Sequence, residues 1–484
     1  MSGNQVLIIS VLYFLALFII AFFTARGATT AIFFNVEKKA KWYLVAFGMV
    51  GVAISGLDFL LIPLGVGTSG FSDIQRVFGY LLGYAFVATI LLPIYYKLNL
   101  ISIYSYFETR FGFWSQKSGA FFFLISRALR TAFRIFIVTS ILHELVFKSL
   151  GINFFVILLI GLTIIFFYSL RGGIKTIIWT DVFNTSLIII VVGLIINFLV
   201  QNVGGTFNEA MIKVQESKYS IAFFWETGSD SHFFKQFLSG IFIAVVFNGL
   251  DQDIMQKHLS CKNISDAQKN MFWFVIVLVI VNIFMLTLGA LFFLYADQYG
   301  VQGTDSSFLI GLLQHNFSNF VLVLFFIGLM AACFSSTDSA LISLTTSFCI
   351  DFLDFGKTKT GEATKRMTRI QVHLVFSIIL FIIVALFKLI NNERVVESIF
   401  TVASFTYGPL LGLFAFGLFT KWNLKDRYVP LVCSIAPIIS YLMNFFSEEL
   451  FNGHQFGNEL VILNGIITFL GLMTLIRKKV SSLA

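Results

Sequence analysis

Long apolar segments, separated by short polar stretches, fill most of this 484-residue chain. Each has the roughly 20 residues that a helix needs to cross the hydrocarbon core of a bilayer. The short alternation of apolar and polar positions that marks membrane β-strands is not seen. The pattern therefore predicts an all-α polytopic membrane protein with 13 transmembrane helices, roughly at residues 5–24, 42–66, 77–97, 118–147, 152–170, 176–201, 234–257, 271–296, 319–350, 370–390, 395–420, 428–447 and 459–476.

Two of these spans carry polar and helix-breaking residues near their middle. The second reads GMVGVAISGLDFLLIPLG from Gly48, and the seventh reads FNGLDQDIMQKHL from Phe247. Backbone groups freed by such a break cost several kcal/mol in a membrane unless they line a cavity or bind an ion. For Gly48 and Gly51 alone, plain helix packing explains the glycines equally well, and Asp251 can be a mere helix end.

The two interrupted spans begin two sets of five helices, residues 42–201 and 234–420. An odd number of helices in each set inverts the second relative to the first. Breaks at matching places in inverted halves indicate the binding site of a secondary transporter. We expect one membrane domain over 1–484, a 5+5 inverted-repeat core with an extra N-terminal helix at 5–24 and two extra C-terminal helices at 428–476. The first span lacks a basic flank and a cleavage site, so we expect it to be retained.

The net charge of +8 follows from topology, although basicity can indicate nucleic-acid binding. With the N-terminus outside and the C-terminus in the cytoplasm, the predicted inside segments hold 23 Lys and Arg residues and the outside segments seven. This bias agrees with the positive-inside rule. We therefore expect a multi-pass protein of the plasma or inner membrane, with the lipid bilayer as a partner and no nucleic acid.

A band of hydroxyls, FSSTDSALISLTTSF, ends the apolar ninth span at residues 334–348. Ala332, Ser335, Ser336 and Ser339 follow i, i+3, i+4, i+7 spacing and share one helix face. Hydroxyl and carbonyl oxygens are the ligands that a hard cation such as sodium prefers. The alternative is that these hydroxyls bond back to carbonyls of their own helix.

Charged residues also lie within predicted spans, where by default they mark a site or a pathway. Asp58 is mid-span, and Asp181 lies a few residues inside the cytoplasmic end of the sixth span, where snorkelling or capping is the alternative.

Arg127, Arg130 and Arg134 form a stripe on one face of the fourth span. Arg127 is close enough to the cytoplasmic end to snorkel. Arg134 is too deep to do so, and it either pairs with Asp58 or Asp251 or binds an anionic group of a solute.

Enzymatic chemistry finds little support in the sequence. GTSG at 67–70 resembles a membrane serine-protease turn, but no later span holds a His at a plausible depth except His373, which lies near a cytoplasmic end. The chain has no HExxH motif and no glycine-rich phosphate loop. We expect no enzyme and no catalytic residue.

Four segments together resemble the sodium:solute symporter family over nearly the whole chain. RGGIKTIIWTDVFN is similar to the family's GG-x-K-x-x-x-W-T-D-x-x-Q segment, with Asn184 in place of Gln. DQDIMQKHLSCKNISDAQKN is similar to its D-Q-x-x-x-Q-R-x-L-x-x-K segment, with Lys257 in place of Arg. AACFSSTDSALISLTTSF is similar to A-A-x-M-S-S/T-x-x-S, and YGPLLGLFAFGLFTKW to the tenth core helix.

The resemblance implies the ten-helix inverted-repeat fold of a bacterial leucine transporter and a sodium site. Carried over by position, that site takes carbonyls of Gly51, Ile54 and Ala332 and hydroxyls of Ser335 and Ser336. A second sodium site, found in some members, would fall at Asp181, Ser339 and Asp338, although Asp338 stands where a hydroxyl would serve. The candidates for contact with solute are Asp58, Arg134, Asp251 and Gln252.

We therefore expect a sodium-coupled symporter that imports a small organic solute or a small anion by alternating access, working as a monomer. A proton-coupled transporter using Asp58 or Asp181 is the alternative, followed by a transporter-like sensor or channel.

Overall fold

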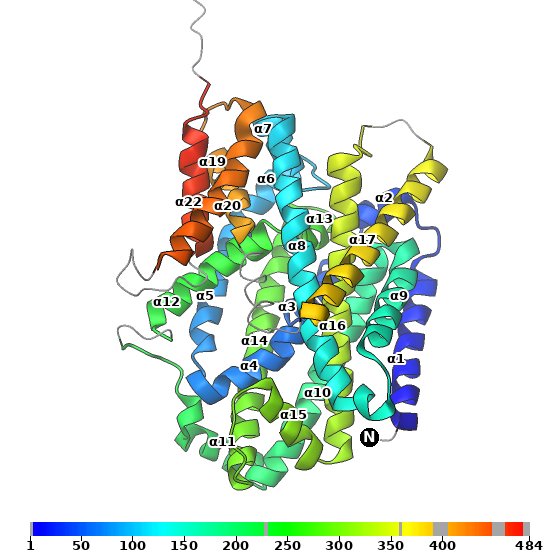
Figure 1. Ribbon diagram of the computed structural model, residues 1–484, viewed down its shortest axis with the longest axis vertical. Coiled ribbons are helices and arrows are strands. Elements are labelled where there is room, and N and C mark those ends of the chain that lie inside the picture. The colour runs from blue at the N-terminus through cyan, green and yellow to red at the C-terminus, as the bar shows by residue number, and fades with distance from the viewer. Residues whose placement is uncertain (1–2, 227–230, 358–360, 391–404, 448–459, 478–484) are drawn as a thin grey trace, which may run out of the picture.

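The computed structural model describes residues 3–226, 231–357, 361–390, 405–447 and 460–477. Within these ranges the chain forms helices joined by short connections and no β-strand (Figure 1). The first part of the predicted span 395–420 lies outside the described residues, as do four of the counted basic positions, Lys359, Arg394, Lys478 and Lys479.

The first half of the chain supplies ten α-helices, and a π-helical turn at Val87–Leu91 makes α5 and α6 one continuous span. These helices are α1 (Gly3–Thr24), α2 (Thr30–Asn35), α3 (Trp42–Ala53), α4 (Gly56–Ser69), α5 (Asp73–Phe86), α6 (Leu92–Lys97), α7 (Ser105–Arg110), α8 (Phe113–Leu142), α9 (Phe154–Gly172) and α10 (Ile174–Val203).

The second half continues in the same way, with a π-helical segment at Ile243–Gly249 that extends α12. Its helices are α11 (Phe207–Glu216), α12 (Phe233–Phe242), α13 (Gln252–Leu259), α14 (Ile264–Gln298), α15 (Ser306–His315), α16 (Asn319–Ser347), α17 (Glu362–Ile390), α19 (Tyr407–Phe419), α20 (Val429–Phe445) and α22 (Leu460–Met473).

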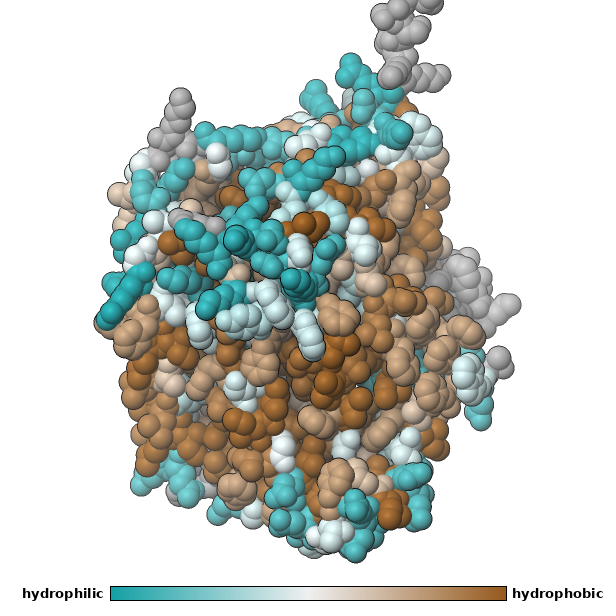
Figure 2. Space-filling view, turned by 180° about the vertical axis from the view of Figure 1, so that it is seen from behind, coloured by the Kyte–Doolittle hydropathy of each residue, from teal (hydrophilic) through white to brown (hydrophobic). Residues whose placement is uncertain are grey.

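On the face seen in Figure 2, hydrophobic residues form a broad band, with hydrophilic residues gathered above and below it. Among the described residues, eight helices are long and apolar enough to cross a membrane, or ten if each of two bent pairs counts as one span. The predicted polytopic, all-helical class is therefore confirmed. The number 13 and the limits of the two repeats remain predictions.

The bent pairs are the two spans in which the sequence predicted a break. The axes of α3 and α4 differ by 62°, and those of the α12 segment and α13 by 69°. At the first bend, Ser55 and Asp58 form a capping box: the Ser55 hydroxyl accepts from the Asp58 N–H at 3.4 Å, and Asp58 Oδ2 accepts from the Ser55 N–H at 3.2 Å. The Ser55 hydroxyl also donates to Asp58 Oδ2 at 2.6 Å. Asp58 is thus the residue that restarts the helix after the break.

At the second bend, Asp251 occupies the N-cap of α13 and its side chain accepts a hydrogen bond from the Asp253 N–H at 2.8 Å. The short side-chain acceptor satisfies one of the N–H groups that a helix start leaves unpaired. Asp251 is therefore a helix end, which was one of the two readings of its sequence.

Helix α16 forms the centre of the bundle, and every residue from Phe334 to Ser347 is buried. It packs against α3, α4, α8, α9, α10, α13 and α17. The hydroxyl band therefore lies in the protein interior and not at a helix end in water.

Candidate functional site

The break between α3 and α4 lies directly against α16. A Cβ placed on Gly56 would be 3.3 Å from the Cα of Cys333 and 2.7 Å from Cγ2 of Val138. Only a glycine allows this approach without a shift of the neighbours. Ile54, just before the break, has non-helical dihedrals, φ −88° and ψ 77°. The start of α4, just after the break, thus meets α16 at Cys333, between Ala332 and the serine pair in the sequence.

Gly48 and Gly51 bring α3 against α10. A Cβ on Gly48 would lie 2.9 Å from Cβ of Asp181, and one on Gly51 would lie 2.4 Å from Oγ1 of Thr185. The Gly51 N–H donates to Thr185 Oγ1 at 3.0 Å, and that hydroxyl donates to the Gly48 carbonyl at 3.1 Å. Both glycines therefore have a packing role. Sequence reasoning missed Thr185, although it stands four residues after Asp181 on the same helix face.

The serine pair has oxygen lone pairs to spare. The Ser335 hydroxyl donates to Oδ1 of Asp181 at 2.7 Å, and the Ser336 hydroxyl donates to the Cys333 carbonyl at 3.1 Å. A hydroxyl has one proton and two acceptor lone pairs, so each serine oxygen can still coordinate a cation. Further along the band, the hydroxyls of Ser343 and Thr345 bond back within α16 at 2.8 Å.

Asp181 is buried and pairs with Lys257. The side chains of both residues are 1% exposed, and Lys257 Nζ lies 2.6 Å from Asp181 Oδ2. The snorkelling alternative for Asp181 is therefore excluded, and Lys257, counted among the basic residues of the inside segments, lies in the protein interior. The reason is the second bend, which turns α13 back into the protein.

Arg127 is also buried, so its expected snorkelling is wrong. Its guanidinium pairs with Asp253 and lies 3.6 Å from Asp251. Asp251 therefore serves Arg127 as a counter-ion, and it also accepts a hydrogen bond from the Tyr407 hydroxyl at 2.7 Å.

Asp338 and Ser339, expected near Asp181 as a second sodium site, turn to other partners. Asp338 accepts from the Tyr168 hydroxyl at 2.5 Å and from the Ser339 N–H at 2.6 Å. The Ser339 hydroxyl donates to Asp253. Neither residue has a hydrogen bond to Asp181 among the described contacts.

A polar cavity of about 130 Å³ lies between the two bends. It combines residues of the first break with residues of the α12 segment: Ala53, Ile54, Asp58, Ile62, Asp73, Arg76, Tyr80, Tyr84, Arg130, Arg134, Ile243, Phe247, Asn248, Leu278 and Asn282. Of the predicted solute contacts it includes Asp58 and Arg134. Asp251 and Gln252 are not among its lining residues, and Gln252 instead bonds Ile101 and Ile103 at 2.8 and 2.9 Å.

The charges in this cavity are unevenly paired. Asp73 and Arg76 form an ion pair at 2.5 Å, and Asp58 is engaged by Ser55. Within the described residues Arg130 and Arg134 form no ion pair, and Arg130 Nη1 and Arg134 Nε are buried without a hydrogen-bond partner. Arg130 stacks 4.6 Å from the ring centroid of Phe247. The cavity thus offers unpaired guanidinium donors.

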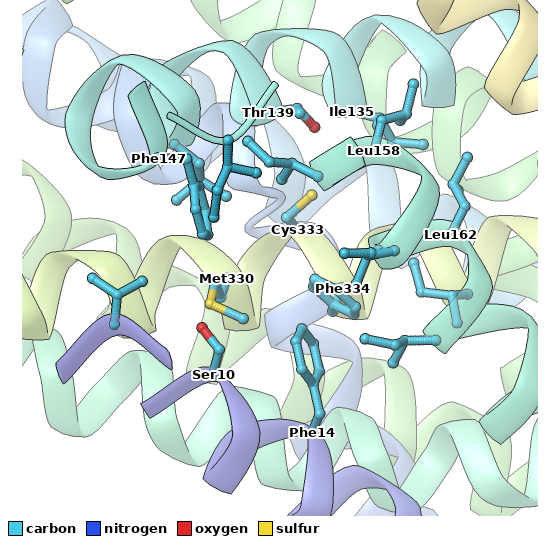
Figure 3. Close-up of a pocket in the computed structure, with 18 of the residues that line it drawn as sticks. Ser10, Phe14, Ile135, Thr139, Phe147, Leu158, Leu162, Met330, Cys333 and Phe334 are labelled. Atoms are coloured by element: carbon cyan, nitrogen blue, oxygen red, sulfur yellow. The ribbon is translucent and has the colours of Figure 1, made fainter. Parts of the chain in front are cut away.

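A larger cavity of about 450 Å³ lies on the other side of Cys333, between α1, α8, α9 and α16 (Figure 3). Its walls are apolar side chains, such as Phe14, Phe147 and Phe334, with only scattered hydroxyls. It provides no charged partner, so the polar cavity between the bends is the better candidate for a solute.

Comparison with known proteins agrees with this geometry. The family model described as the sodium:solute symporter family matches residues 33–425. A sodium/sialic acid symporter of Aliivibrio fischeri is 24% identical over 466 residues, covering 92% of this chain and 89% of the relative. The human sodium/iodide cotransporter is 23% identical, covering 82% of this chain and 62% of the relative.

A solved structure has the same fold. The substrate-bound, outward-open state of a sodium-coupled sialic acid symporter matches with a TM-score of 0.81 at 18% identity, covering 96% of each chain. The family resemblance and the sodium-coupled, non-enzymatic function expected from the sequence are thereby confirmed. The chain belongs to the sodium:solute symporter family and is a multi-pass membrane protein that couples the import of a small solute to sodium.

Proposed function

We propose that this symporter imports a small anionic solute, with sodium held at the contact between the first break and α16. The ligands are the carbonyl oxygens of Gly51, Ile54 and Ala332 and the hydroxyl oxygens of Ser335 and Ser336. The close approach of Gly56 to Cys333 supports this site, because it holds the break that follows α3 against α16 next to Ala332 and close to the serine pair. The last carbonyls of a helix have no partner within that helix and are available to a cation.

The solute site proposed here is the polar cavity between the bends, with Arg134 and Arg130 as the anion-binding groups. Two buried guanidinium nitrogens without a hydrogen-bond partner are the observation that carries this proposal. A buried unpaired donor is costly, and a carboxylate or another anion would satisfy it. Sialic acid and iodide, the solutes in the names of two relatives, are both anions. Asp58, Asp251 and Gln252 then act by shaping the bends.

Coupling follows from the position of the sodium site. Sodium would tie the broken helix to α16 and so order the cavity beside Ile54, which raises the affinity for solute by linkage. Rocking of the bundle would then expose both sites to the cytoplasm, where sodium is scarce. We infer an N-terminus outside, a cytoplasmic C-terminus and a monomeric working unit. The opposite ends at which α1 begins and α22 finishes in Figure 1 agree with an odd number of crossings.

Proton coupling through Asp58 or Asp181 is less well supported. Asp58 is engaged in the capping box, and Asp181 is held by Lys257 and Ser335. Protonation of either carboxylate would weaken the hydrogen bonds that it accepts and, at Asp181, the ion pair with Lys257.

The decisive experiment is uptake into proteoliposomes with an imposed sodium gradient at equal pH on both sides. The solutes are iodide, sialic acid and small monocarboxylates, chosen first by sodium-dependent thermal shift of the purified protein. Accumulation of an anion that collapses with the sodium gradient supports the proposal. Accumulation that follows only a pH gradient, or a ligand set limited to cations and neutral solutes, contradicts it.

A further inference from the structure

The ammonium of Lys257 contacts Asp181, one of the three residues to which sequence resemblance assigns a second sodium ion. Lys257 belongs to α13, the second half of the bent pair, and it reaches Asp181 of α10 across the interior at 2.6 Å. The other oxygen of Asp181 accepts from Ser335 at 2.7 Å. Both carboxylate oxygens are therefore engaged by groups of the protein.

The other two residues of the expected second site do not converge with Asp181 on a common point. Asp338 is bound by Tyr168 from α9 and by the N–H of Ser339, and the Ser339 hydroxyl is bound to Asp253. A hard cation needs several oxygens directed at one position. Among the described residues, Asp181 shares no hydrogen-bond partner with Asp338 or Ser339. While Lys257 holds Asp181, the three residues therefore do not form one site for a second sodium ion.

A tethered ammonium also has an advantage over a free ion at this place. Its effective concentration at Asp181 is set by the fold, whereas sodium must be drawn from solution and lose its water. A buried carboxylate needs a counter-charge, and Lys257 supplies it in every state that keeps the contact.

We propose that Lys257 is a built-in cation at Asp181 that replaces a second sodium, so that this protein binds one sodium ion in each transport cycle. The proposal rests on the sodium site at Ser335 and Ser336. It makes Lys257 a positioning residue that fixes ion number without contacting the solute.

The test uses radioactive sodium as the only ligand, bound to the purified full-length protein at pH 8. Wild-type protein is expected to bind one sodium per chain with a Hill coefficient of about 1. Lys257→Met is expected to bind two, with a Hill coefficient rising towards 2, because Asp181 becomes free to hold a cation. Lys257→Arg keeps the charge and should bind one. Asp181→Asn combined with Lys257→Met removes both charges and should return the number to one.

The outcomes separate the two proposals. Wild-type protein that binds no sodium would contradict the Ser335 and Ser336 site itself. Wild-type protein that binds two would overturn only the role of Lys257, as would a folded Lys257→Met variant that still binds one. Gel filtration of each variant establishes that it is folded. If Lys257→Met does not fold, the number of sodium ions bound by the wild-type protein decides the question.

Discussion

The hydroxyl of Ser335 on α16 donates a hydrogen bond to Oδ1 of Asp181 on α10, at 2.7 Å. This contact joins the proposed sodium site to the ion pair formed by Asp181 and Lys257. Sequence resemblance assigns Ser335 and Asp181 to two separate ion sites. Because Gly48 packs on Cβ of Asp181, the broken helix, α10 and α16 meet at one place. Binding or release of sodium at this site would thus alter the contacts of all three helices.

Replacing Ser335 and Ser336 together by alanine should remove sodium binding. Each oxygen contact to a charged partner contributes about 1.5–3 kcal/mol, so losing two lowers sodium affinity by about a hundredfold or more. The measurement is the sodium-dependent rise in Tm of the purified protein, which should vanish over the range that stabilises wild type.

The matched control is Ser343→Ala with Ser440→Ala. Both serines are fully buried and bond to carbonyls of their own helices, at 2.8 and 2.9 Å. This double variant should keep the sodium-dependent shift. If it loses the shift as fully as the first variant does, the effect belongs to buried serines in general and not to the site.

Arg134→Met should weaken anion binding and leave sodium binding intact. An unpaired guanidinium that meets a carboxylate contributes about 1.5–3 kcal/mol, so the solute affinity should fall about 10- to 150-fold. The measurement is titration of the anion found in the uptake screen, at saturating sodium. Arg76→Met is the control from the same cavity, because Arg76 is already paired with Asp73. Equal losses in both variants would mean that the cavity acts only through its total charge.

Arg127→Met should instead destabilise the fold. Arg127 is buried with Asp253 and Asp251, and removing one partner of a buried ion pair costs about 3–5 kcal/mol. The thermal midpoint in detergent should therefore drop clearly, whereas Arg134→Met, which breaks no ion pair among the described residues, should change it little. The reverse order of the two midpoints would contradict the division of the arginine stripe into structural and binding members.

Gly51→Ala should destabilise the contact between α3 and α10. The new Cβ would lie 2.4 Å from Oγ1 of Thr185, and overpacking of this kind costs about 1–3 kcal/mol. Thr185→Ala should restore part of the loss by removing that oxygen. Gly193→Ala on α10, where no neighbour lies within 4 Å, should be neutral or slightly stabilising. Thermal unfolding of wild type and of the three variants, Gly51→Ala, Gly51→Ala with Thr185→Ala, and Gly193→Ala, compares them directly.

Patterns local to the sequence predicted the helical class and both breaks correctly, because span length and helix-breaking residues act over a few turns. The glycines of "GMVGVAISG" and the polar run of "FNGLDQD" mark the two bends of 62° and 69°. The hydroxyl band was also found, since its spacing is a property of a single helix.

Pairings across helices could not be read in the same way. Lys257 was counted among the basic residues of the inside segments, and only the bend brings it to Asp181. Arg127 and Arg134 lie on the same face of one helix, yet only Arg127 contacts the carboxylates at the start of α13. Which charges are paired depends on tertiary contacts, and periodicity along one helix carries no information about them.

The predicted orientation can be tested with single cysteines at the two ends of the molecule. Figure 1 places α11 at the bottom, the end of the molecule at which the chain also starts, and α7 near the top. The positive-inside count puts α11 outside and α7 in the cytoplasm.

Glu216, at the end of α11, and Thr109, in α7, are exposed. Glu216→Cys should therefore react with a membrane-impermeant maleimide in intact cells, and Thr109→Cys only after permeabilisation. Wild type is the background control, since Cys261, Cys349 and Cys433 are buried and Cys333 faces the apolar cavity. Labelling in the opposite order would invert the topology and would also reverse the direction in which the sodium gradient drives the proposed cycle.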